Sequence, residues 1–577
     1  MSRPRIVIVG AGFAGYRTAR VLSRLTRHRA RITLLNPTDY FLYLPLLPQV
    51  AAGVLEPRRV TVSLSGTLPD VRLVLGEADA VDLDGHTVHY SGPEGDPGTL
   101  SFDRLVLAAG SVNKLLPVPG VAEHAHGFRG LPEALYLRDH VTRQLELAAA
   151  EDDPKSCSAR CTFVVVGAGY TGTEVAAQGK LFTDAQTRRR PLKPRWLLLD
   201  IADRVLPELD ERLSRTADKV LRERGVDVRT GTSVKEATHG GVLLSDGEFI
   251  DTRTLVWCVG VRPDPLVESL GLPMERGRLL VDPHLQVPGR PELFACGDAA
   301  AVPDLEKPGA YTPMTAQHAW RQGKIAARNV AASLGIGERR AYRHRDMGFA
   351  VDLGGVKAAA NPLGLPLSGV AAGAVTRGYH LAAMPGNRVR VAADWLLDAV
   401  LPRQAVQLGL VRSWSVPLDT ASPELARVPG KRDKPVEDQM NEPARNQPGG
   451  EPARNQPGGE PARNQPGGEP AKSQPGGEPA KSQSGGEPAK SQSGGEPAKS
   501  QPGGEPAKSQ PGGEPAKSQP GGEPAKSQPG GEPAKSQPGG EPAKNQPGGE
   551  HTEPPGPIKR TDFPPDPRPD HPAEGDS

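Results

Sequence analysis

Two stretches of the chain carry almost the same short sequence, RIVIVGAGFAG at residues 5–15 and TFVVVGAGYTG at residues 162–172. Each joins a run of β-branched and other apolar residues to three glycines in the spacing G-x-G-x-x-G. This feature constrains the fold more than any other, because few architectures combine a buried strand, a tight glycine turn and a helix in that order. The repeat predicts an α/β fold with two strand–turn–helix units in one chain.

The first unit has the arrangement of a Rossmann-like dinucleotide-binding domain. Its first glycine permits a tight turn, the second lets the backbone approach a pyrophosphate, and the third lets the helix pack against the strand. A pyrophosphate then lies at the helix N-terminus, where free N–H groups and the helix dipole favour an anion. The predicted cofactor-binding residues here are Gly10, Gly12, Phe13, Ala14 and Gly15.

The next strand of the first unit, RITLL, ends at Asn36. An acidic residue usually stands at this point and binds the ribose hydroxyls of the dinucleotide. Asn36 can accept the same hydrogen bond but carries no charge. We predict that Asn36 contacts the cofactor, with the alternative that it only caps a turn.

The second unit repeats the arrangement, and its next strand, RWLLL, ends at Asp200. A carboxylate there suits the two hydroxyls of an adenine ribose and repels a 2′-phosphate, so this unit should prefer NADH to NADPH. The basic sequence RRRPLKPR at 188–195 is either an exposed insert or an aid to phosphate binding. The predicted binding residues are Gly167, Gly169, Thr171, Gly172 and Asp200.

Two dinucleotide units suggest two dinucleotides that exchange electrons, a nicotinamide donor and FAD. The glycines alone do not identify the FAD, but two later segments support it. LVLAAGS at 105–111 ends in a small-residue turn that contains Ala109 and Gly110. PELFACGDAA at 291–300 places Gly297 and Asp298 directly after a short apolar strand.

With these four motifs in order, the chain resembles the two-dinucleotide-binding flavoprotein reductases over residues 1–345. The resemblance implies that the first glycine turn binds the FAD pyrophosphate and that Gly297 and Asp298 contact the flavin ribityl chain and phosphate. It also implies an NAD domain inserted between two halves of the FAD domain. The expected boundaries are 1–118 and 263–345 for the FAD domain, 119–262 for the NAD domain, and 346–418 for a small C-terminal domain that meets a membrane or a dimer partner.

Within that superfamily the chain resembles the type II NADH dehydrogenases, which pass electrons from NADH through FAD to a quinone. YLPLLPQVAAGVLEP at 43–57 is similar to the family's stretch beside the flavin. TLVWCVGVRPDPL at 254–266, which contains Gly260, is similar to the strand and turn near the nicotinamide. The sequence therefore predicts bound FAD, NADH as substrate and a quinone as acceptor.

The same resemblance implies three residues on the reacting side. Glu174, in GYTGTE, matches a family glutamate that assists proton or quinone handling, although the helix dipole alone also favours a glutamate in a first turn. Gln317, in TAQHAWRQG, matches the first of two glutamines under the flavin. Arg321 stands where the second glutamine is expected, and either bonds a quinone carbonyl or the reduced flavin, or lies on the surface.

Residues 387–401, NRVRVAADWLLDAVL, predict an amphipathic helix that Pro402 ends. Its predicted apolar face comprises Val391, Ala392, Trp395, Leu396, Ala399 and Val400. Such a face suits a helix lying on a membrane surface, and equally suits packing on its own domain or on a second subunit. No run of about 18 apolar residues occurs, so we expect a cytoplasmic protein with peripheral membrane contact.

Composition and spacing exclude other classes of function. The formal net charge is +2, and the sequence has no basic stripe, recognition-helix motif or zinc spacing, so we expect no nucleic acid and no metal. The cysteines do not form a flavin-facing pair, so disulfide reduction is not expected. They are Cys157, Cys161, Cys258 and Cys296.

From about residue 430 the apolar residues nearly vanish. A nonapeptide, EPARNQPGG drifting to EPAKSQPGG, repeats twelve times from Glu442 to Gly549. This composition cannot bury enough apolar surface to offset the entropy of ordering, so residues 430–577 are predicted to be disordered. The repeats are either a spacer for the distal segment or an expansion without function.

The sequence thus predicts an FAD-dependent oxidoreductase that carries electrons from NADH to a quinone. Two other functions stay open at this point. One is a soluble NADH–flavin reductase with another acceptor, and the other is a nucleotide-sensing flavoprotein without turnover.

Overall fold

The computed structural model describes residues 3–344, 347–404, 406–413, Val416 and Leu418, together with two short strands in the repeats. Chain contacts divide it into Met1–Ala444 and Arg445–Ser577. The strands β28 (Ser493–Gly494) and β29 (Glu496–Ala498) pair antiparallel. The composition did not predict this pair, because backbone pairing needs no apolar side chains. The rest of the predicted disordered tail lies outside the described residues.

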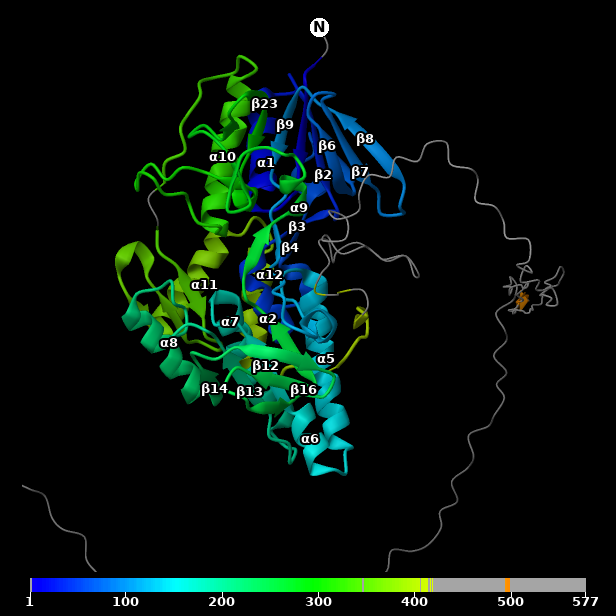
Figure 1. Ribbon diagram of the computed structural model, residues 1–577, viewed down its shortest axis with the longest axis vertical. Coiled ribbons are helices and arrows are strands. Elements are labelled where there is room, and N and C mark those ends of the chain that lie inside the picture. The colour runs from blue at the N-terminus through cyan, green and yellow to red at the C-terminus, as the bar shows by residue number, and fades with distance from the viewer. Residues whose placement is uncertain are drawn as a thin grey trace, which may run out of the picture. The chain divides into compact units, whose positions relative to one another are not determined.

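The first glycine turn lies at the carboxyl edge of a six-stranded sheet with the order β22-β23-β9-β1-β2-β5. β1 pairs parallel with β2 and β9, and β22 pairs antiparallel with β23 at one edge. The helices α1 (Phe13–Thr26) and α10 (Ala316–Ala332) pack together on this sheet (Figure 1). The strands are β1 (Arg5–Val9), β2 (Arg31–Asn36), β5 (Arg72–Leu75), β9 (Arg104–Leu107), β22 (Gln286–Val287) and β23 (Arg290–Ala295).

The second glycine turn lies at the edge of a five-stranded parallel sheet with the order β11-β18-β12-β13-β14. Alternate residues of β12 face opposite sides, as strand geometry requires. On one side, Phe163 and Val165 belong to the main core cluster, which also contains Val175 and Ala176 of α7. On the other side, Val164 and Val166 belong to a second cluster, which also contains Val242 of β16. The strands are β11 (Ala125–His126), β12 (Thr162–Val166), β13 (Arg195–Leu199), β14 (Val226–Arg229) and β18 (Thr254–Trp257), and α7 (Tyr170–Thr187) and α8 (Glu211–Glu223) contact them.

The chain passes between the two sheets twice, and the two passes lie side by side. β10 (Ser111–Asn113), which follows the first sheet's β9, pairs antiparallel with β19 (Val261–Pro263), which follows the second sheet's β18. All strands of the second sheet therefore fall between β9 and β23 in the chain. This topology brings segments on both sides of the predicted domain boundaries to one place.

Smaller elements surround the two sheets. The antiparallel pairs and three-stranded sheets are β3 (Tyr40–Leu42) with β4 (Thr61–Ser63), β6 (Glu77–Asp82) with β7 (Thr87–Ser91) and β8 (Pro97–Ser101), and β15 (Val234–Thr238) with β16 (Gly241–Leu244) and β17 (Phe249–Asp251). β20 (Met274–Glu275), β21 (Arg278–Leu280) and β24 (Ala300–Ala301) form a third small sheet. The remaining helices are α2 (Leu47–Ala51), α3 (Leu64–Thr67), α4 (Val121–His124), α5 (Leu131–Ala149), α6 (Pro154–Arg160) and α9 (Pro265–Glu268), with 3-10 turns η1 (Leu44–Leu46), η2 (Pro57–Arg59), η3 (Gly297–Ala299) and η4 (Pro362–Gly364).

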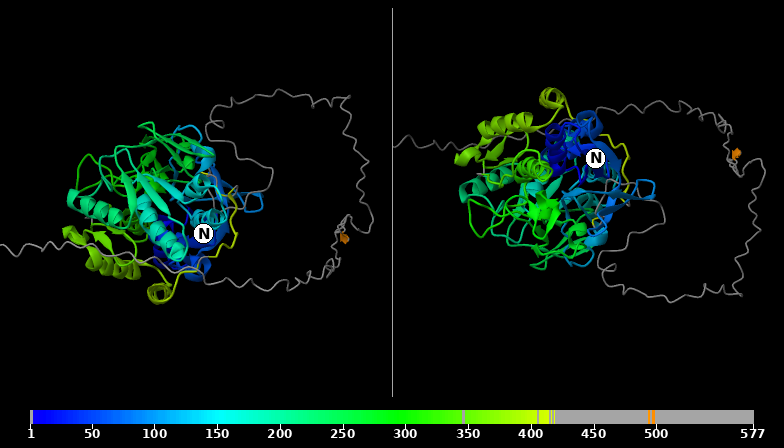
Figure 2. Two further views of the ribbon diagram at one scale, coloured as in Figure 1. Left: turned by 90° about the horizontal axis from the view of Figure 1, so that it is seen from below. Right: turned by 90° about the horizontal axis from the view of Figure 1, so that it is seen from above.

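The C-terminal part of the described chain consists of one small sheet and two helices. The sheet contains β25 (Ala350–Asp352), β26 (Ala358–Ala360) and β27 (Leu367–Ser368). The helices α11 (Gly369–Ala383) and α12 (Arg388–Val400) follow it and are coloured yellow-green in Figures 1 and 2. None of the helices in the described part of the chain has the length and apolar character needed to cross a membrane.

The helix α12 forms where predicted, but its inward face differs from the predicted apolar face. Val391 and Asp394 are buried and Trp395 is half-buried, whereas Leu396 and Val400 are 66% and 68% exposed. Asp394 points inward because it forms an ion pair with Arg59, at 2.9 Å between Oδ2 and Nε. The sequence left open what the apolar face meets, and it did not predict that Asp394 faces inward, because a hydrophobic pattern does not show a buried salt bridge.

Candidate functional site

The first glycine turn is built as the motif predicts. Gly10 has φ of +91°, and a Cβ on it would collide with the carbonyl oxygen of Ala108. A Cβ on Gly15 would collide with the carbonyl oxygen of Gly10, so this glycine is needed for helix α1 to approach the turn. A Cβ on Gly12 would meet nothing within 4 Å. Gly12 thus faces open space at the N-terminus of α1, whose first turn contains no acidic residue.

Asn36, the last residue of β2, and Asp200, which follows β13, each form hydrogen bonds that support the glycine turn of their unit. Asn36 Oδ1 accepts a hydrogen bond from the N–H of Ala11 at 2.7 Å, and its Nδ2 donates to Thr38. Asp200 Oδ2 accepts from the N–H of Ala168 at 2.5 Å, and its Oδ1 accepts from the N–H of Ala202 at 2.8 Å. The turn-capping alternative for Asn36 is therefore part of its structural role, and both side chains hold the loop that follows β1 or β12.

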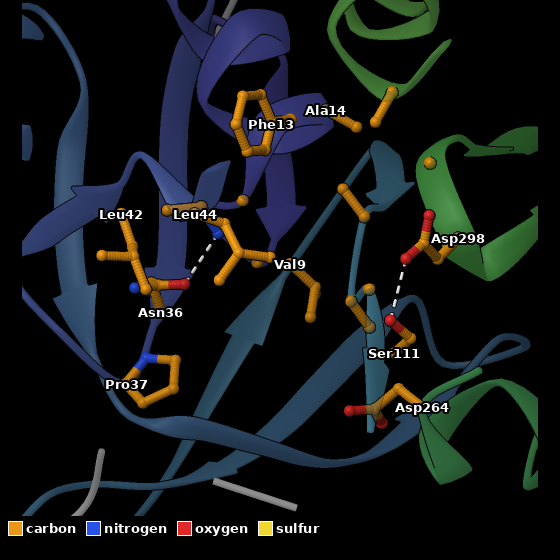
Figure 3. Close-up of a pocket in the computed structure, with 18 of the residues that line it drawn as sticks. Val9, Phe13, Ala14, Asn36, Pro37, Leu42, Leu44, Ser111, Asp264 and Asp298 are labelled. Carbon is orange, nitrogen blue, oxygen red and sulfur yellow. Dashed lines mark hydrogen bonds between the residues drawn. The ribbon is translucent and has the colours of Figure 1, made fainter. Parts of the chain in front are cut away.

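A pocket of about 450 Å³ opens at the first turn (Figure 3). Thr171 from the second glycine turn and Asp264 and Leu266 from the segment after β19 also line it, so both units contribute to its wall. The predicted site residues on the wall are Gly10, Gly12, Phe13, Ala14, Asn36, Ala109, Gly110, Thr171, Gly297 and Asp298. The predicted residues that do not line it are Gly15, Gly167, Gly169, Gly172, Glu174, Asp200, Gly260, Gln317 and Arg321.

Asp298 lies on the wall of this pocket, next to Gly297, and is half-buried. Its Oδ2 accepts a hydrogen bond from Ser111 Oγ at 2.8 Å (Figure 3). Burial raises the pKa of Asp298, while the Ser111 hydrogen bond and the positive charge of Arg278 oppose that rise. The backbone N–H of Gly297 donates a hydrogen bond to Gln322 Oε1 at 2.8 Å. Ser111 and Gln322 stand inside two motifs, LVLAAGS and TAQHAWRQG, but no role was predicted for them from the sequence, because their contacts with Asp298 and Gly297 form only on folding.

The second glycine turn has the same internal geometry as the first. A Cβ on Gly167 would collide with the carbonyl oxygen of Cys258, and one on Gly172 with that of Gly167. Gly169 and Gly260 again have nothing within 4 Å of an added Cβ, so both leave backbone open to a ligand. The basic sequence at 188–195 lies exposed along most of its length, and Arg190 and Arg195 pair with Glu146 and Asp227.

The three residues predicted on the reacting side meet at one short segment, residues 347–352. Gln317 Oε1 accepts from the N–H of Met347 at 3.1 Å, and its Nε2 donates to the carbonyl of Gly348 at 3.2 Å. Arg321 donates to its own helix at Gln317 and to Met347 Sδ. Glu174 Oε2 accepts from the N–H of Asp352 at 2.9 Å. Arg321 is half-buried, and its side chain contacts this segment instead of extending freely from the surface.

The cysteines lie away from the pocket. None of the four lines it, and none is in a disulfide. Burial raises the pKa of Cys161 to about 11 and the pKa values of Cys258 and Cys296 to about 12, so these thiols stay protonated at neutral pH. Across the described residues, no three His, Cys, Asp or Glu side chains gather as metal ligands would.

Helices α1 and α10 create a basic surface that the sequence analysis did not expect. Neither helix contains Asp or Glu, and each carries three cations at spacings of three and four residues. The helices are in contact, because Thr18 Oγ1 donates to the carbonyl of Gly323 at 3.1 Å and Arg17 stacks on Trp320 at 4.7 Å. Among the described residues none forms an ion pair with these six cations, Arg17, Arg20, Arg24, Arg321, Lys324 and Arg328. Two short rows far apart in the sequence thus form one cationic surface, which no single window of the sequence contains.

Comparison with known proteins identifies the family of this chain. The pattern of the family described as pyridine nucleotide-disulphide oxidoreductase matches residues 4–323. A type II NADH:quinone oxidoreductase of Mycobacterium tuberculosis is 30% identical over 427 residues, which cover 70% of this chain and 89% of that protein. A demethylphylloquinone reductase of Synechocystis is 30% identical over 406 residues, covering 68% and 96%.

The fold agrees as well. The structure of NDH2 from Plasmodium falciparum in complex with NADH superimposes with a TM-score of 0.65 at 16% identity, covering 70% of this chain and all of that chain. The two glycine turns, the shared pocket and these likenesses lead to one conclusion. The chain belongs to the pyridine nucleotide-disulphide oxidoreductase family and, within it, to the type II NADH:quinone oxidoreductases.

Proposed function

We propose that this protein transfers electrons from NADH to a quinone and uses FAD as its resident cofactor. The observation that carries the proposal is the single pocket to which both glycine-turn units contribute, with Gly12 on one side and Thr171 on the other. A donor held by one unit and a cofactor held by the other would thus meet at a common wall. The relatives named above have this activity by name.

The residues of the first unit fit FAD. Gly12 leaves the N-terminus of α1 open to a pyrophosphate, and Asn36 stands where a ribose would lie. Gly297, which lies close to Ala14 of α1, and Asp298 line the same pocket. FAD, when bound, accepts a hydride from the nicotinamide and returns electrons to the acceptor. We assign Ala109 and Gly110, which line the same wall, to this cofactor too.

The residues of the second unit fit NADH. Gly169 opens the N-terminus of α7 to its pyrophosphate, and Gly260 leaves the backbone after β18 accessible. Asp200 keeps lone pairs free beyond its two backbone hydrogen bonds, so it can accept from ribose hydroxyls while its charge disfavours a 2′-phosphate. NADH should therefore be preferred to NADPH.

We place the acceptor side at residues 347–352. Glu174, Gln317 and Arg321 all bond to this segment, which links α7 and α10. Glu174 would hold a proton on its carboxyl group, and Arg321 would supply a positive charge close to a developing negative one. The domains assigned to these roles are residues 1–118 with 263–345, 119–262 and 346–418, as the sequence suggested.

We also propose that α11 and α12 rest on an anionic membrane surface. Leu396, Leu397 and Val400 are exposed on α12, and Leu401 is exposed directly after it. Val370, Val375 and Tyr379 are exposed on α11. Arg321 of α10 contacts Met347, which is 45% exposed and precedes β25 in the same C-terminal part of the chain. Apolar side chains and adjacent cations are the combination that binds anionic lipid interfaces. The protein would then work in the cytoplasm at the membrane face.

Vesicle binding tests the membrane contact. Wild-type protein should sediment with phosphatidylglycerol-containing vesicles and much less with vesicles of phosphatidylcholine alone. Lys324→Glu should reduce this difference in the sedimented fraction more than Leu396→Ser does. A homodimer that buries the same residues would instead appear as a concentration-dependent mass in sedimentation velocity. Equal binding to both vesicle types would refute the role of the cations.

The central experiment is steady-state NADH oxidation by FAD-loaded protein with a water-soluble quinone, ferricyanide and oxygen as parallel acceptors. We expect rapid turnover with the quinone and saturation by it. Rapid turnover with ferricyanide and none with any quinone would show that the natural acceptor belongs to another class.

A further inference from the structure

Two half-buried acidic residues lie together where α7 meets β25. Glu174 lies one turn into α7, and Asp352 ends β25. The backbone N–H of Asp352 donates to Glu174 Oε2 at 2.9 Å, and the carboxylate charge of Asp352 acts on Glu174. Two ionised carboxylates in such surroundings repel each other, so one proton is expected to remain with the pair.

The hydrogen-bond donors decide which carboxyl ionises. Asp352 Oδ2 accepts from Gln49 Nε2 at 2.6 Å and from Gln178 Nε2 at 3.1 Å, and its Oδ1 accepts from the N–H of Gly354 at 2.8 Å. Glu174 accepts the single N–H of Asp352. Donors stabilise the charged form of a carboxylate, so Asp352 is the ionised member.

The orientation of Gln49 is itself fixed by α12. Trp395 Nε1 donates to Gln49 Oε1 at 2.6 Å. Since an indole can only donate, the amide oxygen must face Trp395 and the amide N–H groups must face Asp352. Gln49 therefore cannot turn its acceptor toward Asp352 without losing the Trp395 hydrogen bond.

The charges around the pair act in the same direction. Burial raises the pKa of Glu174 well above its ordinary value, the charge of Asp352 raises it further, and the N–H of Asp352 opposes this in part. Burial raises the pKa of Asp352 too, but the Gly354 N–H and Gln49 lower it. Arg377 of α11 and Arg224, which follows α8 directly, also lower it. The charged group that acts on Glu174 is thus Asp352, while both arginines act on Asp352.

We propose that Asp352 is a positioning residue that keeps Glu174 protonated, so that the pair holds one exchangeable proton beside residues 347–349. Gln49, Gln178 and Trp395 maintain the ionised form of Asp352. The use of that proton in quinone reduction rests on the function proposed above, but the protonation state of the pair does not. No motif in the sequence assigns a role to Asp352.

Infrared difference spectroscopy of FAD-loaded protein across a pH series tests the pair directly. Wild-type protein should show the C=O band of a protonated carboxyl that disappears only at a pH well above the ordinary pKa of a glutamate. Glu174→Gln should remove this band. A band that persists in Glu174→Gln would place the proton elsewhere and overturn the assignment, whatever happens to other variants.

Asp352→Asn removes the charge and should move the titration of the Glu174 band to lower pH by about one to three units. Asp352→Glu restores a charge and should return the midpoint toward that of wild type. Asp139→Asn is the matched control, since Asp139 is buried and accepts the N–H groups of Leu408 and Gly409, and it should leave the band unchanged. An unmoved midpoint in folded Asp352→Asn would refute the role of Asp352.

The pH profile of quinone-dependent turnover separates this inference from the proposed function. If Asp352→Asn shifts the infrared midpoint and the activity profile together, the role of Asp352 and the proposed quinone reduction are both supported. A shifted infrared midpoint without quinone turnover in wild type would defeat the proposed function and leave the carboxyl pair intact. Quinone turnover in wild type, with an infrared midpoint and an activity profile that Asp352→Asn leaves unshifted, would refute the role of Asp352 and leave the proposed function intact.

Discussion

The two glycine-turn units have nearly the same sequence and backbone, yet corresponding side chains meet different surroundings. Arg17 on α1 and Glu174 on α7 occupy the same position, two residues after the third glycine. Burial lowers the pKa of Arg17, and Arg20, Arg24 and Arg321 lower it further. Burial and Asp352 raise the pKa of Glu174. In each case neighbours of the same sign disfavour the charged form, but the neighbours are the other cations of α1 and α10 in one case and the Asp352 carboxylate in the other.

The units also differ in enclosure. The first turn forms one wall of the pocket, whereas Thr171 is the only residue of the second turn, Gly167–Gly172, on the pocket wall. A group bound at the first turn would thus contact residues of both units, including Thr171 and Asp264.

Substituting the middle glycine of each turn should have the largest effects, and these effects should differ between the two units. An added side chain at Gly12 or Gly169 meets no protein atom within 4 Å, so the fold should tolerate valine at both. Gly12→Val should purify without flavin, while Gly169→Val should keep FAD and lose about 100-fold or more in kcat/KM for NADH. Flavin absorbance and NADH kinetics measure this. Loss of FAD from both variants would mean that the two turns are not specialised.

Asp200 provides a smaller and more specific test. A hydrogen bond to a charged group contributes about 1.5–3 kcal/mol, so Asp200→Ala should reduce kcat/KM for NADH by about 10- to 100-fold and narrow the preference over NADPH. Asp200→Asn removes the negative charge but keeps an oxygen that can accept the Ala168 N–H. Comparing it with Asp200→Ala therefore separates the effect of the charge from the effect of losing the hydrogen bond that holds the turn. Asn36→Ala, the matched change in the first unit, should loosen FAD and spare the KM for NADH. Equal use of both nucleotides by wild type would contradict the role of Asp200.

Glu174→Gln should change the pH dependence of stability. The folded state holds the Glu174 proton to higher pH than the unfolded chain does, because the pKa of this carboxyl is raised on folding. Between the two pKa values the unfolded state binds fewer protons, so the free energy of unfolding falls as pH rises. The Tm of Glu174→Gln relative to wild type should therefore increase from about pH 5 to about pH 8. Calorimetry that finds a constant difference would contradict a buried proton at Glu174.

Removal of residues after Gly430 should have the smallest effect. The repeats contain no aromatic or β-branched residue and so offer no core to lose. We expect FAD content, NADH kinetics and Tm to remain as in the full chain. A Tm lower by several degrees would mean that the tail packs on the folded part.

The sequence by itself determined the parts that depend on local backbone chemistry. The strands at Arg5–Val9 and Thr162–Val166, the glycine turns and the helices after them form as predicted, because only glycine fits where a Cβ would collide with a carbonyl. The α/β fold and the family follow from the order of these motifs and are confirmed by the comparisons. The roles of individual site residues and the domain boundaries remain predictions.

The tertiary structure alone decided what arises from contacts between distant segments. The inward turn of Asp394, the cationic surface of α1 and α10, and the meeting of Glu174, Gln317 and Arg321 at residues 347–352 have no signature in any single stretch of sequence. Asp352 lies in no recognised motif, and it becomes significant only because Gln49, Gln178 and Gly354 direct their N–H groups at it. A glycine turn is specified by sterics within a few residues, whereas the protonation of a buried carboxyl depends on donors and charges that only folding brings together.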